Sequence, residues 1–443
     1  MNDRILEIRN LAANFARETI DTRRHLHMNP ELSFNEIESS KYIVSKLREL
    51  DIPVRNAGGG HGVLAQIQGT KHSSGIGSGD SVGIGSGDSV GIGSADSSVG
   101  IGSADSAADA NTRTVALRAD IDALPIQEEN NIEFKSRNPG VMHACGHDAH
   151  SAILLSAAKI LKELHRHFSG TVQLIFQPAE ERCPGGALGL IDHGALDNVN
   201  LILGEHINPA LPVGTVGFRT GAAHASADEL NLYVRGRGGH AAMPHKLIDP
   251  VLISSHIIVA LQQIVSRQSR ADEPCVLSFG KIDAPGAMNV IPDTVRIAGT
   301  FRAFDEDWRD RALENIQHMA VSIAEGMGGT CDVEITKGYP VLINNDALTL
   351  RARGAAARFL GEKQVVDLPL AMWSEDFAYY NKIVPGCFYN LGVGNTEKGW
   401  SSPLHSPTLM IDERALEIGS GLMAWLAFSE LTDDADDDSK QAG

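Results

Sequence analysis

Strand-like and helix-like patterns of apolar residues alternate along the first half of the chain. Residues 115–117 form a short apolar run typical of a buried strand, and a pattern with 3.6-residue spacing over 153–164 predicts a helix. Asp148 precedes that pattern, where its side chain can cap the helix. Alternation over 172–176 and an apolar run over 201–203 predict two more strands. This rhythm of strand, helix and strand is typical of a mostly parallel α/β sheet.

Residues 223–340 carry a second pattern, which predicts four strands and two helices in the order β-α-β-β-α-β. That order makes a complete ferredoxin-like unit. We therefore expect an α/β main domain, built from 1–222 and 341–430, with an α+β domain inserted over 223–340. The predicted elements of the inserted domain are 229–234, 253–264, 275–282, 294–303, 308–327 and 330–336.

Two segments are predicted to lie outside the fold. Residues 73–110 repeat short Gly, Ser and Asp motifs between two predicted strands, 62–68 and 113–117. A calcium-binding solenoid is the alternative interpretation, but the repeat lacks the nonapeptide pattern and has too few turns to build a core. A flexible insertion is therefore favoured. The acidic tail, 431–443, is expected to be disordered and not a metal site.

Composition and charge narrow the class of protein. A chain of 443 residues, 42% hydrophobic and 21% charged, fits a globular protein of two domains. The net charge of -18 argues against nucleic acid and anionic membranes as partners, and no apolar run is long enough to span a bilayer. The N-terminus lacks the apolar region of a signal peptide, and the five cysteines are scattered. We therefore expect a cytoplasmic protein.

The strongest local chemical signal is the pair Cys145 and His147, two residues apart and just ahead of a predicted helix. A thiolate and an imidazole at this spacing can face one metal ion. Such a pair alone is a weak signal, because buried cysteines are often not ligands. The neighbouring His143 and His150 are interpreted as structural or supporting residues.

Further polar residues follow the predicted strands. Glu180 and Glu181 come just after 172–176 and Pro178, and in open α/β sheets sites form beyond the carboxyl ends of strands. Two adjacent carboxylates can have different roles, one as a metal ligand and the other as the group that transfers a proton. His206 follows the run 201–203, and His405 lies in a loop between two prolines. Together with the C-x-H pair, these residues offer enough ligands for two metal ions that share a water.

These motifs resemble those of the co-catalytic metallopeptidase superfamily of aminoacylases and carboxypeptidase G-type enzymes. Within it, they are most similar to the hippurate hydrolase and auxin-conjugate hydrolase branch. The resemblance covers nearly the whole chain outside the repeat and the tail. The segments that carry it are RHLHMNPE (24–31), LRADIDALP (117–125), MHACGHD (142–148), QPAEE (177–181), GEH (204–206), GHA (239–241), NVIP (289–292) and WSEDF (373–377).

The resemblance implies a two-metal site with Glu180 as the general base. The implied ligands of two divalent ions are Cys145, His147, Glu181, His206 and His405. Thiolate and imidazole suit zinc, while carboxylates also admit manganese, with cobalt or nickel possible. Asp120 and Asp122 stand where the wider superfamily has an H-x-D motif, and we expect them to support a ligand and not to bind metal directly.

The resemblance also implies that the inserted domain forms a homodimer and closes over the site. His240 and Asn289 match positions that reach an active site, often that of the partner subunit, to stabilise the oxyanion. Arg302 is a candidate for binding the substrate carboxylate.

The implied activity is hydrolysis of the amide bond of N-acyl amino acids, which releases an acid and a free amino acid. A dipeptidase or carboxypeptidase on the same site is the alternative, because the residues that separate an acyl group from a free amino group are not evident. A non-catalytic metal-binding or ligand-binding protein is a second alternative. The intact Glu180 and ligand set argues against it.

Overall fold

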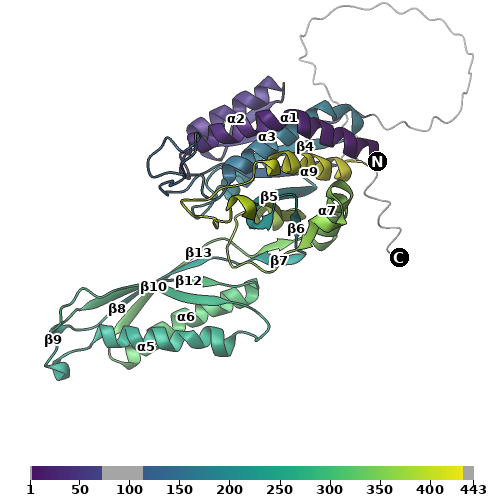
Figure 1. Cartoon of the computed structure of the whole chain (residues 1–443). Coiled ribbons are helices and arrows are strands. Elements are labelled where there is room, and N and C mark those ends of the chain that lie inside the picture. Colours follow the sequence, from purple (N-terminus) through teal and green to yellow (C-terminus); the bar gives the residue numbers. More distant parts are fainter. Residues whose placement is uncertain (1, 72–112, 433–443) are drawn as a thin grey trace, which may run out of the picture.

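A large mixed sheet forms the centre of the main body in the computed structural model, which describes residues 2–71 and 113–432 (Figure 1). The central neighbours run parallel, and antiparallel pairs flank them on both sides. In spatial order, the strands are β1 (Val54–Ala57), β2 (Gly62–Gln68), β4 (Thr171–Gln177), β3 (Thr114–Asp120), β5 (Leu201–Pro212), β16 (Gly386–Gly394), β6 (Val216–Phe218) and β15 (Val365–Asp367).

Apolar side chains point alternately to the two faces of this sheet. In β3, Val115, Leu117 and Ala119 pack into one core, while Ala116 packs into the other. Long helices cover the first core: α1 (Asn2–Met28), α2 (Ile37–Glu49), α3 (His147–Glu163), α7 (Asp346–Leu360) and α9 (Arg414–Glu430). Shorter elements cover the second: α4 (Ala187–Asp192), α8 (Ala378–Asn381), β7 (Gly221–His224) and β14 (Leu342–Asn344).

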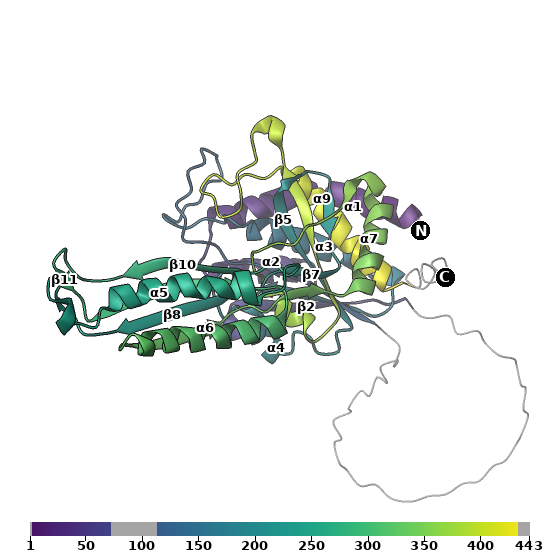
Figure 2. The same cartoon turned by 90° about the horizontal axis from the view of Figure 1, so that it is seen from below.

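Residues 228–337 form a separate antiparallel sheet with an apolar core of its own. Both helices lie on one face of this sheet, as the view from below shows (Figure 2). Each helix starts at an aspartate cap: Asp249 accepts from the backbone of Val251 and Leu252, and Asp305 from that of Trp308. The elements are β8 (Asp228–Arg235), α5 (Pro250–Gln263), β10 (Val276–Asp283), β12 (Thr294–Arg302), α6 (Glu306–Gly326) and β13 (Thr330–Lys337).

A small ribbon forms the far tip of this unit. Its two strands, β9 (Gly239–His240) and β11 (Val290–Ile291), pair antiparallel. In both views the ribbon lies at the end of the unit that is farthest from the eight-stranded sheet (Figures 1 and 2). Short 3₁₀ turns lie at Gly58–Gly60, His165–His167, Pro244–Lys246, Glu362–Gln364 and Thr396–Lys398, and a π turn at Ile264–Gln268 extends α5.

The fold class predicted from the sequence is confirmed. The sheet order β10-β12-β8-β13 is that of a ferredoxin-like unit, and the main sheet is parallel at its centre. The boundaries at 222/223 and 340/341 stay predictions. Among the described residues, no helix is both long and apolar enough to cross a membrane.

Three local predictions need correction or fall outside the described chain. Asp148 does not cap α3, because the helix begins at His147 with Gly146 in the cap position and the carboxylate instead binds Arg23 and His27. β5 does not end before His206 but continues to Pro212. The insertion 73–110 and the tail beyond 432 lie outside the described residues, whereas Leu431, assigned to the tail, packs into the core.

Candidate metal centre

The register of the central strands brings the predicted site residues to one edge of the sheet. Asp120 at the end of β3 pairs with Gln177 at the end of β4. Arg118 pairs with Gly204 of β5, so His206, two residues further along, is level with Asp120. Because these strands are parallel, the segments that follow β3 and β4 meet beside His206 at this edge.

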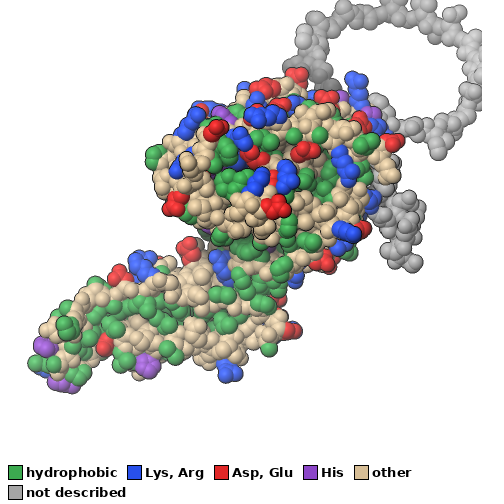
Figure 3. Space-filling view, viewed as in Figure 1, with side chains coloured by type: hydrophobic (Ala, Val, Ile, Leu, Met, Phe, Trp, Pro, Cys, Tyr) green, Lys and Arg blue, Asp and Glu red, His purple; other side chains and the backbone are tan. Residues whose placement is uncertain are grey.

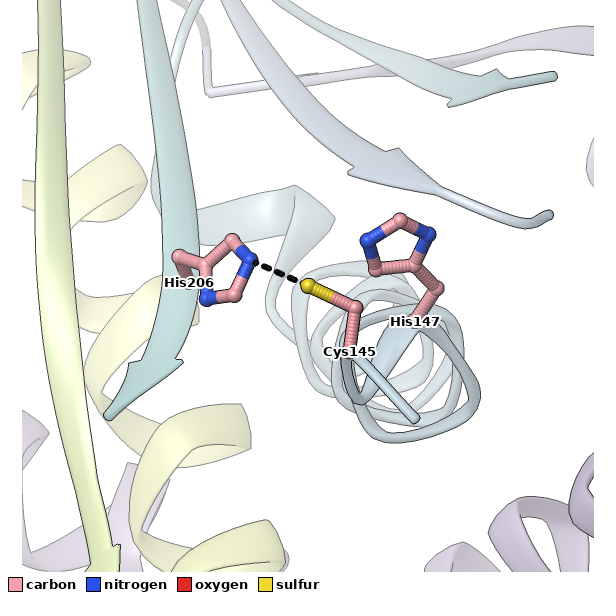
Figure 4. A group of neighbouring side chains, drawn as sticks. All are labelled: Cys145, His147 and His206. Atoms are coloured by element: carbon pink, nitrogen blue, oxygen red, sulfur yellow. Dashed lines mark hydrogen bonds between the residues drawn. The ribbon is translucent and has the colours of Figure 1, made fainter. Parts of the chain in front are cut away.

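Gly146 separates the two residues of the C-x-H pair at the start of α3. Its φ of 93° lies in the left-handed region, and a Cβ there would sit 2.2 Å from Cδ1 of Ile207. Only glycine therefore allows this close approach of α3 to β5. The approach brings Cys145 against β5, where its Sγ lies 3.3 Å from Nε2 of His206 (Figure 4).

Both histidines present Nε2 toward the centre of the group. The Nδ1 of His206 donates to the carbonyl oxygen of Ile207 at 2.7 Å, and Nδ1 of His147 lies 3.1 Å from Oδ1 of Asp122. The Nε2 of His147 is buried and makes no hydrogen bond. Bonds of this kind at Nδ1 set the tautomer and leave Nε2 as the ligand atom.

Glu181 and His405 form a second group with Cys145. His405 Nε2 lies 3.1 Å from Oε1 of Glu181, and its own backbone N–H donates to the carbonyl oxygen of Ala144 at 2.8 Å. The ligand atoms of Cys145, His147 and His206 lie within 4.8 Å of one another, and so do those of Cys145, Glu181 and His405.

The structure thus brings all five predicted ligands together, in two groups that share the Cys145 thiol. The mixture of sulfur, imidazole nitrogen and carboxylate oxygen fits divalent transition metals. The Nε2 of His147 inside the first group is buried and makes no hydrogen bond, with carboxylate oxygens of Asp120 and Glu181 at 3.7 and 3.9 Å, so a cation would satisfy it. The residues therefore fit a pair of ions with one shared ligand.

The acid–base state of the group depends on bound cations. Burial raises the pKa of Cys145 well above its usual value, and the charges of Glu181 and Glu180 add to this. Burial lowers the pKa of His147, but the carboxylates of Asp120 and Asp122 outweigh it and raise the pKa to about 10. Cation binding must therefore remove a proton from both side chains.

The backbone of Glu180 is held at three points. The preceding residue, Ala179, has a left-handed φ of 56° and donates its N–H to Oε1 of Glu36 at 2.8 Å. The N–H of Glu180 donates to Asp122 at 3.1 Å, and its carbonyl oxygen accepts from the Tyr339 hydroxyl at 2.5 Å. Burial and the charges of Glu375, Glu181 and Asp376 raise the pKa of the Glu180 carboxyl well above its usual value.

Asp122 organises both halves of the site. Its carboxylate faces His147, accepts from the Ser33 hydroxyl at 2.7 Å, and accepts from the backbone N–H groups of Glu180 and Glu181 at 3.1 and 3.0 Å. Burial raises its pKa, but the hydrogen bonds from His147 and Ser33 outweigh burial and hold the pKa below its usual value. The supporting role expected of Asp122 stays a prediction.

Asp120 belongs to a buried charge network beneath the ligands. Its carboxylate binds Arg118 at 2.6 Å and His150 Nδ1 at 2.6 Å. The other ring nitrogen of His150 accepts from the backbone N–H of Ile207, so this histidine has no lone pair left for a metal. Arg118 also donates to Glu375 at 3.0 Å and to Asp376 at 2.9 Å.

Several of these supporting residues were not singled out from the sequence. Ser33, Glu36 and Tyr339 come from distant segments and have no motif spacing, so only the folded chain brings them to the site. Arg118 and Glu375 stand in segments that carried the family resemblance, which was the one available signal.

The remaining predicted site residues lie on the inserted unit. His240 and Asn289 are exposed neighbours at its far tip, where Ala241 N–H donates to the Asn289 carbonyl oxygen at 3.0 Å. Within one chain the structure does not bring them to the metal-ligand group (Figure 1). Arg302 ends β12 and is half-buried; its Nη1 is buried and makes no hydrogen bond, and burial lowers its pKa.

Comparison with known proteins gives consistent matches over most of the chain. The profile of the peptidase family M20/M25/M40 matches residues 116–428. An N-acetyl-L-cysteine deacetylase of Bacillus subtilis is 37% identical over 90% of this chain and 85% of its own length. The IAA-amino acid hydrolase ILR1-like 5 of Arabidopsis thaliana is 34% identical over 95% of this chain and 88% of its own. The crystal structure of the Bacillus subtilis YXEP protein, a dinuclear metal binding peptidase, has a TM-score of 0.75 and 33% identity and covers 95% of this chain and 99% of its own.

Proposed function

Because this chain belongs to the peptidase family M20/M25/M40, we propose that it hydrolyses N-acyl amino acids to a carboxylic acid and a free amino acid. Family membership makes it a metal-dependent hydrolase of amide bonds. The single observation that carries the proposal is the pair of ligand groups sharing Cys145, with the Glu180 carboxyl beside them.

The proposed ligands of one ion are Cys145, His147 and His206, and those of the other are Cys145, Glu181 and His405. Zinc or manganese suits this donor set best, with cobalt or nickel as further candidates. When bound, the ions polarise the scissile carbonyl and make a water acidic enough to attack it near neutral pH. Asp122 is proposed to orient the ligand His147, while Asp120 bonds His150 beneath the ligands, and neither aspartate is assigned as a ligand.

Glu180 is proposed as the general base. Its carboxylate takes a proton from the attacking water and then gives that proton to the nitrogen of the leaving amine. A raised pKa suits a group that must accept a proton and release it in the same cycle. The hydrogen bonds from Tyr339 and to Asp122 fix the backbone on which this carboxylate is carried.

The substrate class is supported by the relatives. The Bacillus subtilis deacetylase and the Arabidopsis thaliana hydrolase are both named for N-acylated amino acids. The YXEP protein is described as a peptidase, so a dipeptidase is the second candidate. A panel of hippurate, N-acetyl-methionine, indole-acetyl-alanine and a plain dipeptide separates the two. We expect amino-acid release from the acylated members, and activity on the dipeptide alone would assign the chain as a peptidase.

The Glu180→Gln variant tests the base. The expected result is unchanged metal content by mass spectrometry and a loss of about 10²- to 10⁴-fold in kcat. Glu362→Gln, at an exposed glutamate, is the matched control and keeps full activity. If Glu180→Gln kept near wild-type kcat with both metals bound, another residue would have to move the proton.

A homodimer is proposed to complete the site. His240 and Asn289 lie on the far tip of the inserted unit, so a partner subunit is the route by which they would reach a ligand group to stabilise the oxyanion. Exposed apolar side chains gather on the same unit (Figure 3), among them Val251, Leu252 and Val259 of α5. Arg302 is proposed to bind the substrate carboxylate, since its guanidinium has an unpaired buried nitrogen.

Mixing two inactive variants tests the contribution of the partner. Light scattering is expected to give about twice the chain mass of 47.3 kDa. Glu180→Gln and His240→Ala homodimers are each expected to be inactive, and subunit exchange between them should restore activity, because some mixed dimers carry one intact composite site. A monomer, or mixtures that stay inactive after exchange, would contradict the role of His240 in trans.

The compartment proposed for the chain is the cytoplasm. All five cysteines lie within the described residues and all are free. Free thiols, including one proposed as a metal ligand, are best preserved in a reducing compartment.

A further inference from the structure

A cavity opens beside His206 on the main body. Its volume is about 320 Å³, near the lower end of the range of about 300–1,000 Å³ typical of small-ligand sites. The walls come from the end of β5 and from the loop that leads to His405, so one side of the cavity borders the ligand group. The lining residues are His206, Ile207, Asn208, Pro209, Ala210, Trp373, Asn390, Ser401, Pro403 and Leu404.

The lining of this cavity carries no charge. Within the described parts of the chain, no Asp, Glu, Lys or Arg side chain contributes to it. Of the two halves of an N-acyl amino acid, the amino-acid half bears a carboxylate and the acyl half is uncharged. Away from the proposed metal ligand His206, a carboxylate would lose its hydration here without gaining a cation from the lining, whereas an apolar acyl group loses only unfavourable contact with water.

Trp373 is the one aromatic residue among those that line the cavity, apart from His206. It is 54% exposed although it is large and mostly apolar, and it lines the cavity. The ring meets His224 edge-on, with centroids 5.8 Å apart, and His224 meets Phe388 at 5.6 Å. An aromatic or aliphatic group placed against Trp373 would cover this exposed face.

A smaller space of about 60 Å³ continues behind Trp373. It shares Trp373, Asn208 and Asn390 with the first cavity and reaches the buried His224. Nδ1 of His224 makes no hydrogen bond, and burial lowers the pKa of the ring to about 4, so it is neutral near pH 7. Arg219 also lines this space, where its guanidinium donates to the carbonyl oxygens of Ala222 and Leu368. The extension therefore adds length to the site and combines an uncharged imidazole with one arginine that is bonded to the backbone.

We propose that this cavity is the acyl-group site and that Trp373 makes the enzyme prefer aryl-acyl or medium-chain acyl groups over acetyl. The inference rests on the proposed function, because it assigns one half of that substrate to this cavity. Trp373 is the proposed specificity residue, since it lines the cavity and is not one of the proposed metal ligands.

The test compares kcat/KM for two series of substrates with the metal-loaded enzyme. In the first, the amino acid is constant and the acyl group is acetyl, butanoyl, hexanoyl or phenylacetyl. In the second, the acyl group is acetyl and the amino acid is alanine, methionine or phenylalanine. We expect kcat/KM to rise about fourfold for each methylene added to the acyl group in the first series, which is the gain that burial of one methylene provides. The change in kcat/KM across the second series should be smaller.

Variants then locate the preference. Trp373→Ala should lower the ratio of phenylacetyl to acetyl activity by about tenfold, because the ring loses its stacking partner. Ala210→Leu, which narrows the same cavity, should lower this ratio as well. It replaces Trp373→Ala in the test if that variant fails to fold. Leu350→Ala, which removes an apolar side chain of similar exposure at 60% on α7, is the control and leaves the ratio unchanged. Binding of phenylacetate measured by calorimetry should weaken in Trp373→Ala but not in the control.

The possible failures are distinguishable. If no N-acyl amino acid is cleaved, the proposed function is wrong. If acetyl substrates are cleaved with no preference for longer acyl groups, or if the ratio is unchanged in Trp373→Ala, the acyl-site inference is wrong and the function stands. A preference that follows the amino-acid series instead would assign the cavity to the amino-acid side chain and overturn the inference.

Discussion

Asp122 offers a direct way to separate support of the metal site from ligation. The Asp122→Asn variant keeps the size of the side chain but exchanges one carboxylate oxygen for an NH₂ group. Each oxygen serves two partners: Oδ1 faces His147 Nδ1 and the Glu180 N–H, and Oδ2 faces the Ser33 hydroxyl and the Glu181 N–H. Whichever oxygen is replaced, one buried backbone N–H loses its acceptor.

The size of the effect follows from these contacts. A buried donor left without an acceptor costs about 1–3 kcal/mol. If the amide nitrogen faces His147, the imidazole also loses the acceptor that keeps Nε2 free for a cation. Residues that orient a metal ligand typically contribute about 10- to 100-fold to metal affinity. We expect Asp122→Asn to bind zinc about 10- to 100-fold more weakly than the wild type.

The assay is competition for zinc against a chromophoric chelator at constant pH, with circular dichroism to show that the variant is folded. Ser33→Ala is the graded control, since it removes only one of the four partners and should cost less than Asp122→Asn. If folded Asp122→Asn bound zinc within about twofold of the wild type, Asp122 would not orient His147 in the way these contacts imply.

Three further predictions concern other parts of the site. Tyr339→Phe removes the hydrogen bond to the Glu180 carbonyl oxygen and should lower kcat by about 5- to 100-fold while the metal content stays unchanged. Steady-state kinetics and metal analysis check this, and an unchanged kcat would show that the bond does not position the base. Arg118→Met leaves three buried carboxylates without their cation and should lower the free energy of unfolding by about 3–5 kcal/mol in urea titrations, whereas Arg353→Met, at an exposed ion pair, should change it by less than about 1 kcal/mol. Zinc affinity should rise with pH because Cys145 and His147 must lose protons when the metal binds. In chelator competition at several pH values, Cys145→Ala should show a shallower rise of affinity with pH than the wild type. Equal slopes of affinity against pH would mean that the thiol is not a ligand.

The fold was largely predictable because its elements carry strong periodic patterns. The alternation in β8 and the 3.6-residue spacing in α5 each match a buried face of one core. Ends of elements were less predictable, since they depend on tertiary partners. The apolar run of β5 stops near Gly204, yet pairing with β16 through Pro212 continues the strand past His206.

The hydrogen bonds of the Asp148 side chain were also not predictable, because they depend on tertiary partners. Its position at the start of a helix predicts a cap, but Arg23 and His27 reach it from α1 and take its carboxylate. In buried positions such charged partners outweigh the local preference for capping.

The candidate ligands could be proposed from the sequence because each lies in a short motif, and the family resemblance joined these motifs into one set. Their meeting in two groups around Cys145 was not derivable from spacing, since it requires the register of β3, β4 and β5. The contact of Tyr339 with Glu180 joins residues that are 159 positions apart, and no local sequence pattern indicates it.

The most direct test of the two-metal account is a metal titration of the chelated, metal-free enzyme. Hydrolysis of N-acetyl-methionine and hippurate is followed while zinc or manganese is added in steps, and bound metal is counted by mass spectrometry. The account predicts no activity without metal and full activity at two ions per chain, with Glu180→Gln binding the same two ions but staying inactive. Activity that survives chelation, or that is complete at one ion per chain, would contradict it.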